Sequence, residues 1–168
     1  MSKADPTKPR RIALIASKGS LDMAYPPLIL ASVAASMGWE AGIFFTFYGL
    51  DLIHKERQQH LGVAPLANPA MPSPIPGSSL KIPNIVGVLP GMTAMASMMM
   101  KDWMDKANLA PLDEMFAIAK ESGVRFFACN TTLRVMRIKP EDLMDGVEFA
   151  GSPMFLDYAA DADIQLFI

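Results

Sequence analysis

The stretch that decides the fold is Arg11-Ile12-Ala13-Leu14-Ile15-Ala16-Ser17, near the start of a chain of 168 residues. It is a nearly continuous apolar run of strand length, which is typical of a central parallel strand that is covered on both faces. The loop Lys18-Gly19-Ser20-Leu21-Asp22 follows it. We expect a helix to open at Tyr25 and run to about Met37, because the two prolines after Tyr25 suit a first helical turn.

Further strands and helices alternate along the rest of the chain. The expected strands are Ala41–Phe47, Val124–Cys129, Gly146–Ala150 and Asp163–Ile168. The expected helices are about Leu50–Arg57, Met92–Lys106, Pro111–Ser122, Thr131–Met136, Pro140–Met144 and Pro153–Ala160, the last with Ser152 as its N-cap. This alternation predicts an α/β fold with a mainly parallel five-stranded sheet and right-handed crossovers.

The chain length favours a single domain over residues 1–168 with a substantial core. We expect residues 1–10 to be a flexible N-terminus. Residues 58–83 hold six prolines and two glycines, a density that excludes regular helix and central strand. This segment is therefore expected to be a long loop, and either a lid over a site or a subunit contact would fit it.

The composition narrows the class of partner and the compartment. There are 15 Lys and Arg against 17 Asp and Glu, with a net charge of −2. Because no basic block stands out, a nucleic-acid partner is not expected. The first residues carry charge without an apolar run, which is unlike a secretory signal. A single cysteine offers no disulfide framework, so we expect a cytoplasmic protein.

One uncharged segment, Ile82–Met100, has about the length of a bilayer span. The Pro90-Gly91 pair is expected to break it, so a buried helix or an oligomer contact is favoured over membrane insertion. The expected helix Met92–Lys106 is rich in methionine, which favours packing or self-association. A membrane-attached subunit is kept as a less favoured alternative.

No common cofactor or metal motif is found. The loop after the first strand matches neither the dinucleotide-binding nor the Walker pattern, and we expect no cofactor. The two histidines, His54 and His60, flank charged residues at a spacing unlike that of metal ligands. We expect both histidines to be solvated and no metal to be bound. No carboxylate pair is marked out as a general acid and base.

The lone thiol, Cys129, is the principal candidate for chemistry. It ends an expected strand and precedes residues that suit a helix start. In parallel α/β proteins sites form at the carboxyl ends of strands, and a thiol beside free N–H groups and cations is biased towards thiolate. Arg134 lies about one turn further on. The alternative is that Cys129 is only a small buried apolar residue.

Four other residues are weaker site candidates. Lys18 and Tyr48 each follow a strand at the same edge of the expected sheet, where they would contact an anion and form a pocket wall. Asn130 and Thr131 follow Cys129 directly and are expected to bind substrate at the start of the helix.

Several long segments resemble the DsrE/DsrF-like family, specifically its longer subgroup that is encoded with sulfur-oxidation and sulfur-trafficking genes. The matching segments are residues 15–30 (IASKGSLDMAYPPLIL), 44–50 (FFTFYGL), 68–72 (NPAMP), 83–96 (PNIVGVLPGMTAMA) and 159–168 (AADADIQLFI). The match extends over nearly the whole chain from about Arg11.

The resemblance implies a flavodoxin-like three-layer fold and a sulfur carrier or sulfurtransferase that assembles as a homo-oligomer. It implies that Cys129 is the active thiol and carries sulfur as a persulfide or a thiosulfonate. A TusA-like carrier and rhodanese-like proteins are the implied donors and acceptors. The competing hypothesis is a non-catalytic binding or scaffold subunit of a sulfur-enzyme complex in which Cys129 is buried.

Overall fold

The structure, a computed structural model, describes residues 8–63 and 89–168. These residues fall into two compact units. The first contains 8–19, 23–61 and 111–168, and the second contains 20–22, 62–63 and 89–110. Most of the expected flexible N-terminus and of the proline-rich loop, namely 1–7 and 64–83, lies outside the described residues.

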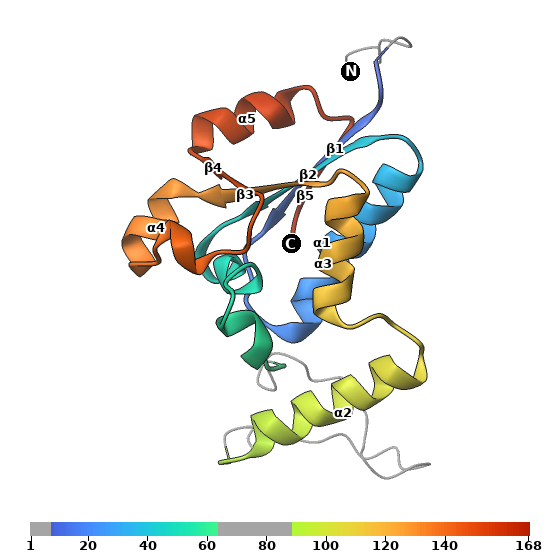
Figure 1. The fold of residues 1–168 in the computed structure, drawn as a ribbon, viewed down its shortest axis with the longest axis vertical. Helices are drawn as coiled ribbons and strands as arrows, with labels where there is room; N and C mark the ends of the chain where they lie inside the picture. The colour runs from blue at the N-terminus through green and yellow to red at the C-terminus, as the bar shows by residue number, and fades with distance from the viewer. Residues whose placement is uncertain (1–7, 64–88) are drawn as a thin grey trace. The chain divides into compact units, whose positions relative to one another are not determined.

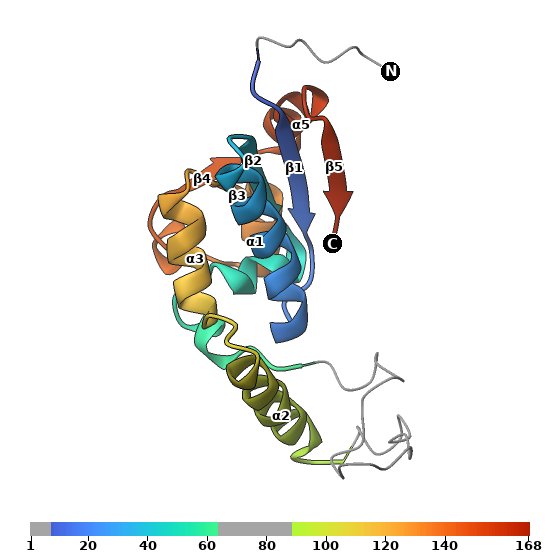
Figure 2. The ribbon, with the colours of Figure 1, turned by 90° about the vertical axis from the view of Figure 1, so that its right-hand side faces the viewer.

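The first unit is built on a five-stranded sheet (Figure 1). Its strands are β1 (Arg11–Ala16), β2 (Glu40–Phe45), β3 (Arg125–Cys129), β4 (Val147–Ala150) and β5 (Ile164–Phe167). Their order is β4-β3-β2-β1-β5, and every neighbouring pair is parallel. The last strand returns to the far side of β1, where the two lie side by side at the edge of the sheet (Figure 2). The α/β fold with a five-stranded parallel sheet is confirmed, and it is consistent with a flavodoxin-like fold.

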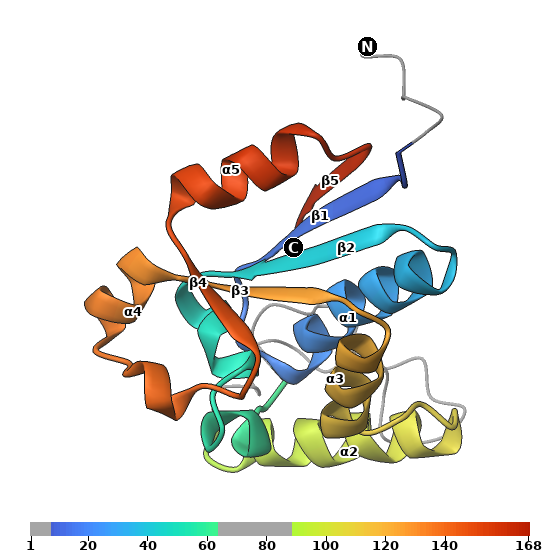
Figure 3. The ribbon, with the colours of Figure 1, turned by 45° about the horizontal axis from the view of Figure 1, so that its top comes forward.

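Helices cover the two faces of the sheet unequally. The helices α1 (Leu21–Ser36) and α3 (Leu112–Glu121) lie on one face, and α5 (Ser152–Ala160) lies on the other (Figures 1 and 3). Because side chains alternate along a strand, Phe45 and Phe126 pack with Phe116 of α3, with ring centroids 5.6 to 6.3 Å apart. On the opposite face Phe44 stacks on Phe155 of α5 at 4.5 Å. Two apolar layers therefore sandwich the sheet.

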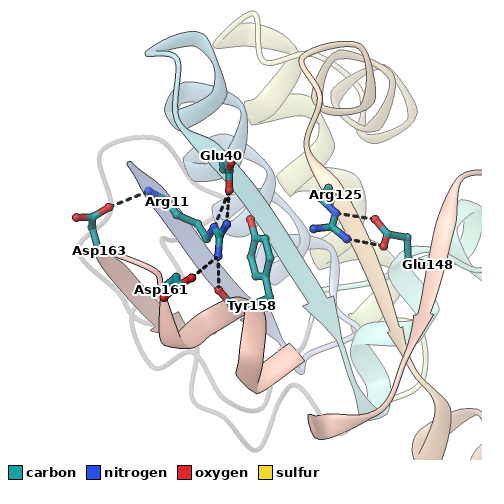
Figure 4. A network of polar contacts seen from close by, with 7 residues as sticks. All are labelled: Arg11, Glu40, Arg125, Glu148, Tyr158, Asp161 and Asp163. Carbon is teal, nitrogen blue, oxygen red and sulfur yellow. Dashed lines mark hydrogen bonds and ion pairs between the residues drawn. The ribbon is translucent and has the colours of Figure 1, made fainter. Parts of the chain in front are cut away.

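Ion pairs clamp the amino ends of the strands (Figure 4). Arg11, the first residue of β1, pairs with Glu40 at the start of β2 through Nη2 and Oε2 at 2.6 Å. Arg125, the first residue of β3, holds Glu148 of β4 through two hydrogen bonds of 2.8 and 2.7 Å. The ring of Tyr158, from α5, lies under the Arg11 guanidinium at 4.6 Å. These contacts fix neighbouring strands in register at one edge of the sheet.

Two helix predictions were wrong in their detail. Helix α1 begins at Leu21 rather than Tyr25, so its two prolines lie inside the helix. The N–H of Leu21 donates to the carbonyl of Gly62 at 3.0 Å. Because the first N–H groups of a helix have no acceptor within it, this bond supports a helix that begins at Leu21. The expected helix Leu50–Arg57 is instead two 3₁₀ helices, η1 (Phe47–Leu52) and η2 (Arg57–His60).

His54 explains the break between those two 3₁₀ helices. Its Nδ1 accepts the backbone N–H groups of Glu56 and Arg57 at 3.3 and 3.4 Å, and a side chain that takes backbone donors competes with helix formation. His54 is only 8% exposed, so the prediction that it is solvated was wrong. His60 is exposed, as predicted.

The remaining elements follow the predictions closely. They are α2 (Met92–Lys106), α4 (Asn130–Met136) and the 3₁₀ helix η5 (Pro140–Asp142). Helix α5 is capped by Gly151 rather than by Ser152. None of the helices within residues 8–63 and 89–168 combines the length and the apolar character needed to cross a membrane. Residues 82–88 of the uncharged segment lie outside the described part of the chain.

Candidate functional site

The thiol of Cys129 is placed by the end of β3. Strand alternation turns Phe127 and Cys129 towards α5, and Cys129 stands opposite Ala150 of β4 in the register. Helix α4 begins at the next residue, Asn130. The sulfur therefore lies at the carboxyl edge of the sheet, where β3 ends.

Two threonine hydroxyls meet beside this thiol. Thr46 follows β2, the strand next to β3, and Thr132 lies in the first turn of α4. Their Oγ1 atoms are 3.0 Å apart. The backbone N–H of Phe47 also donates to Thr132 Oγ1 at 3.3 Å. The end of β2 and the start of α4 are thus tied together by one buried hydroxyl.

Burial and hydrogen bonding shift the pKa of the Cys129 thiol in opposite directions. Burial raises the pKa of Cys129, because it disfavours the charged form. Hydrogen bonds from the hydroxyl and backbone N–H of Thr132, from the hydroxyl of Thr46 and from the backbone N–H of Thr131 favour the thiolate. Their combined effect prevails, and the pKa of Cys129 is lowered from its ordinary value. A thiolate is the form that attacks sulfur.

The thiol is also enclosed. Cys129 is 5% exposed and belongs to an apolar cluster with Phe44, Phe127, Phe155 and Ala150. The neighbouring hydroxyl and N–H groups stabilise a Cys129 thiolate, while the apolar cluster excludes most bulk water from it. Such a site suits a reaction of the thiolate with a group that is narrow enough to reach it.

The structure brings two of the predicted site residues to the thiol. The backbone N–H of Thr131 helps to lower the pKa of Cys129, whereas the Thr131 side chain is exposed. Asn130 begins α4 directly after the thiol, and it is exposed as well. Their positions at the helix start agree with the sequence prediction, and their contact with a substrate remains a prediction.

Lys18 and Tyr48 lie at the same edge of the sheet but do not touch the thiol. A Cβ atom built on Gly19 would stand 2.5 Å from the carbonyl oxygen of Tyr48, so the loop that carries Lys18 runs against the turn that carries Tyr48. Both side chains are exposed. Within the described residues neither forms a hydrogen bond with Cys129, and their roles also remain predictions.

Sequence reasoning missed Thr46 and Thr132. The sequence did contain a signal for Thr132. It lies three residues after Cys129 at the start of a helix, and residues at that spacing lie on the same side of a helix. Thr46 could be found only with the strand order, since β2 must lie beside β3 for its first following residue to reach the thiol.

Comparisons with known proteins find relatives over nearly the whole chain. The sequence profile of the DsrE/DsrF/DrsH-like family matches residues 8–167. A protein of Allochromatium vinosum named "Sulfur carrier protein DsrE2" is 43% identical over 159 residues, which cover 95% of this chain and 98% of that protein. The "Uncharacterized protein YrkE" of Bacillus subtilis is 27% identical over 162 residues, covering 95% of this chain and 97% of the relative.

Proposed function

This chain belongs to the DsrE/DsrF/DrsH-like family, and from that membership we propose that it is a sulfur carrier whose cargo is held on Cys129. The observation that carries the proposal is the lowered pKa of Cys129 at the carboxyl edge of the sheet, with hydroxyl and N–H donors around the sulfur. The relative named as a sulfur carrier supports the same role.

The transfer we propose is exchange at sulfur. The Cys129 thiolate attacks the outer sulfur of a donor persulfide, the donor S–S bond breaks, and the donor cysteine leaves as a thiolate. With a polythionate, the thiolate attacks a sulfenyl sulfur and thiosulfate leaves, so that a thiosulfonate rests on Cys129. An acceptor thiolate then removes the cargo. Each step exchanges one S–S bond for another and needs no external oxidant.

Several finer points belong to the same proposal. A TusA-like carrier and a rhodanese-like protein are the proposed exchange partners, and the chain is proposed to act as a homo-oligomer. Co-purification of a TusA-like carrier with the wild type, and its loss with Cys129→Ala, would support this partner. Equal recovery with both chains would oppose a thiol-dependent complex.

The enclosure of the thiol favours a second candidate function. A cysteine that is 5% exposed also suits a binding or scaffold subunit in which it is only a buried apolar residue. Labelling distinguishes the two candidates. Rapid alkylation of the folded protein below neutral pH supports the carrier, and resistance to a small alkylating reagent supports the binding subunit.

Mass spectrometry of the intact protein tests the carrier directly. The protein is incubated with polysulfide or tetrathionate, and the Cys129→Ser variant is treated in parallel. The carrier predicts an added sulfur or thiosulfonate mass on the wild type that dithiothreitol removes and that the variant lacks. Absence of the adduct, or its presence on the variant, would count against Cys129 as the carrier.

A further inference from the structure

One edge of the sheet presents apolar side chains to solvent. Strand β5 is the outermost strand, beside β1 (Figure 2), and in the part of the chain that the structure describes no further strand pairs with it. Ile164 and Leu166 are 38% and 41% exposed, and Phe167 is 71% exposed. Ile12 and Leu14, which stand opposite Ile164 and Leu166 on β1, are buried. The apolar cover over β1 therefore does not extend over β5.

The usual protections of an edge strand are missing from the sequence of β5. Proteins commonly block exposed edges with charged residues or proline, because the unpaired backbone groups of an edge are a template for another strand. From Ile164 to Ile168 there is no charged side chain and no proline. The preceding Asp163 is engaged with β1, where its Oδ2 accepts the N–H of Arg11 at 2.8 Å. The opposite edge strand, β4, carries Glu148. Of the two edges, β5 is thus the one suited to pairing.

The backbone of β5 offers free groups at its outer side. Ile168 donates its N–H to the carbonyl of Ile15 at 2.7 Å and accepts the N–H of Ser17 at 2.8 Å, so its polar groups face β1. This direction alternates from residue to residue along a strand. Gln165 and Phe167 therefore direct their N–H and C=O groups outward, which leaves two donors and two acceptors for another strand.

Two copies of this strand can satisfy these groups for each other. In an antiparallel pair, two opposite residues exchange both of their N–H···O bonds. Gln165 opposite Phe167 of a copy forms two such bonds, and the symmetric contact forms two more. This register places Leu166 opposite Leu166 of the copy on a twofold axis. Ile164 then faces Ile168 of the copy on the same side of the sheet as Leu166, so only apolar side chains meet there.

From this self-complementarity we infer that two copies of the chain associate through β5, which joins their five-stranded sheets into one continuous sheet with Leu166 at the twofold axis. The inference rests on the homo-oligomer proposed above and assigns its contact surface. It is independent of which cargo Cys129 holds.

This arrangement has a consequence for sulfur transfer. Because antiparallel pairing turns one copy around, the carboxyl edges of the two sheets point in opposite directions. Seven strand spacings separate β3 of one copy from β3 of the other, which is about 33 Å. The two Cys129 thiols therefore cannot exchange cargo with each other within the dimer, and each thiol meets its own partner.

Cysteine cross-linking tests the register in the whole chain. The variant combines Leu166→Cys with Cys129→Ser, so that the introduced thiol is its only one. In the inferred pair the two Cα atoms at position 166 lie about 4.5 Å apart, which a disulfide can bridge. Diamide takes up two electrons and two protons as the two thiols form one S–S bond. We expect a covalent dimer that dithiothreitol reverses on a denaturing gel.

The matched control combines Ile164→Cys with Cys129→Ser. Ile164 is similarly exposed and lies on the same face of β5 as Leu166. In the inferred pair, however, position 164 and its copy are about 13 Å apart along the strands. The control should cross-link at least about tenfold more slowly than the Leu166→Cys variant. Equal rates, or faster cross-linking of the control, would overturn the inference.

Light scattering over a series of protein concentrations tests the association itself. Leu166→Lys places two like charges opposite each other at the axis and should raise the concentration at which the dimer dissociates at least about tenfold. A monomeric wild type would overturn the inference. An assembly that Leu166→Lys does not alter would also overturn it, although the proposed homo-oligomer would then stand on another surface.

The outward N–H of Phe167 has its own pair of variants. Phe167→Pro removes this N–H without removing a hydrogen bond to β1, and proline is tolerated at such a position of an edge strand. Phe167→Ala removes the ring and keeps the N–H, so it should weaken the dimer less than proline does. Equal weakening by both would contradict the backbone pairing. Tetrathionate should load Cys129 equally in wild type and Leu166→Lys, and failure to load the wild type would instead refute the carrier function.

Discussion

Replacing Thr132 by valine should make the Cys129 thiol harder to ionise. Valine has the same shape but no hydroxyl, so the thiolate loses one donor and keeps those of Thr46 and the backbone. A hydrogen bond to a charged group contributes about 1.5–3 kcal/mol. The lower end of that range corresponds to about a tenfold loss of thiolate at a pH below the titration.

The measurement is the rate of alkylation by iodoacetamide as a function of pH. In the wild type the pKa of Cys129 is lowered, so the variant's profile should move towards higher pH. Below neutral pH the variant should react about tenfold more slowly. At high pH both thiols are fully ionised, and the variant should match the wild type or slightly exceed it, because a more basic thiolate is more nucleophilic.

Thr132→Ser is the matched control, because it keeps the hydroxyl and should keep the wild-type profile. Superimposable profiles for Thr132→Val and the wild type would refute the reasoning that this hydroxyl stabilises the thiolate. A loss of equal size at every pH would also refute it, since that result reports altered access to the thiol rather than altered ionisation.

Three further predictions concern stability, measured by chemical denaturation. Tyr158→Phe should leave the free energy of unfolding unchanged or raise it by about 1 kcal/mol. The reason is that the buried Tyr158 hydroxyl has no hydrogen-bond partner among the described residues. A fall of more than about 1 kcal/mol in the free energy of unfolding would contradict this reasoning. The guanidinium hydrogen bond lowers the pKa of Glu148, so Glu148→Gln should cost about 0.5 kcal/mol at neutral pH. That difference should vanish as the pH falls through the folded-state pKa, and a constant or growing difference would contradict the assignment. Gly49→Ala should cost about 3 kcal/mol, since its Cβ would stand 2.0 Å from the carbonyl oxygen of Ala16. Gly151→Ala meets only ordinary contacts and should cost about 1 kcal/mol or less, because alanine is the poorer N-cap for α5. Equal effects of the two substitutions would contradict the clash at Gly49.

The sequence predicted the elements whose character is local. The apolar run of β1 and the methionine-rich α2 (Met92–Lys106) were both placed within one residue of their observed bounds. Cys129 was also placed at the end of its strand. In these segments the spacing of the apolar residues and the length of the apolar run are enough to predict the element, because residues close in sequence decide its conformation.

Predictions failed where a distant or side-chain partner decides the conformation. Helix α1 begins before its prolines, with Leu21 bonded to the carbonyl of Gly62. His54 ends a 3₁₀ turn by accepting backbone donors, which its charged neighbours in the sequence do not suggest. Thr46 reaches the thiol only because β2 lies beside β3, and strand order is not encoded in local periodicity.

The ion-paired edge of the sheet has a consequence for how this architecture changes over evolution. Arg11 with Glu40, and Arg125 with Glu148, clamp four strands at their amino ends, whereas Cys129 and its threonines stand at the carboxyl ends. Strand register is thus secured at one edge and sulfur chemistry is proposed at the other. Substitutions around the thiol can therefore change the cargo or the exchange partner without weakening the contacts that hold the strands in register. The same fold can in this way support carriers that exchange sulfur with different proteins.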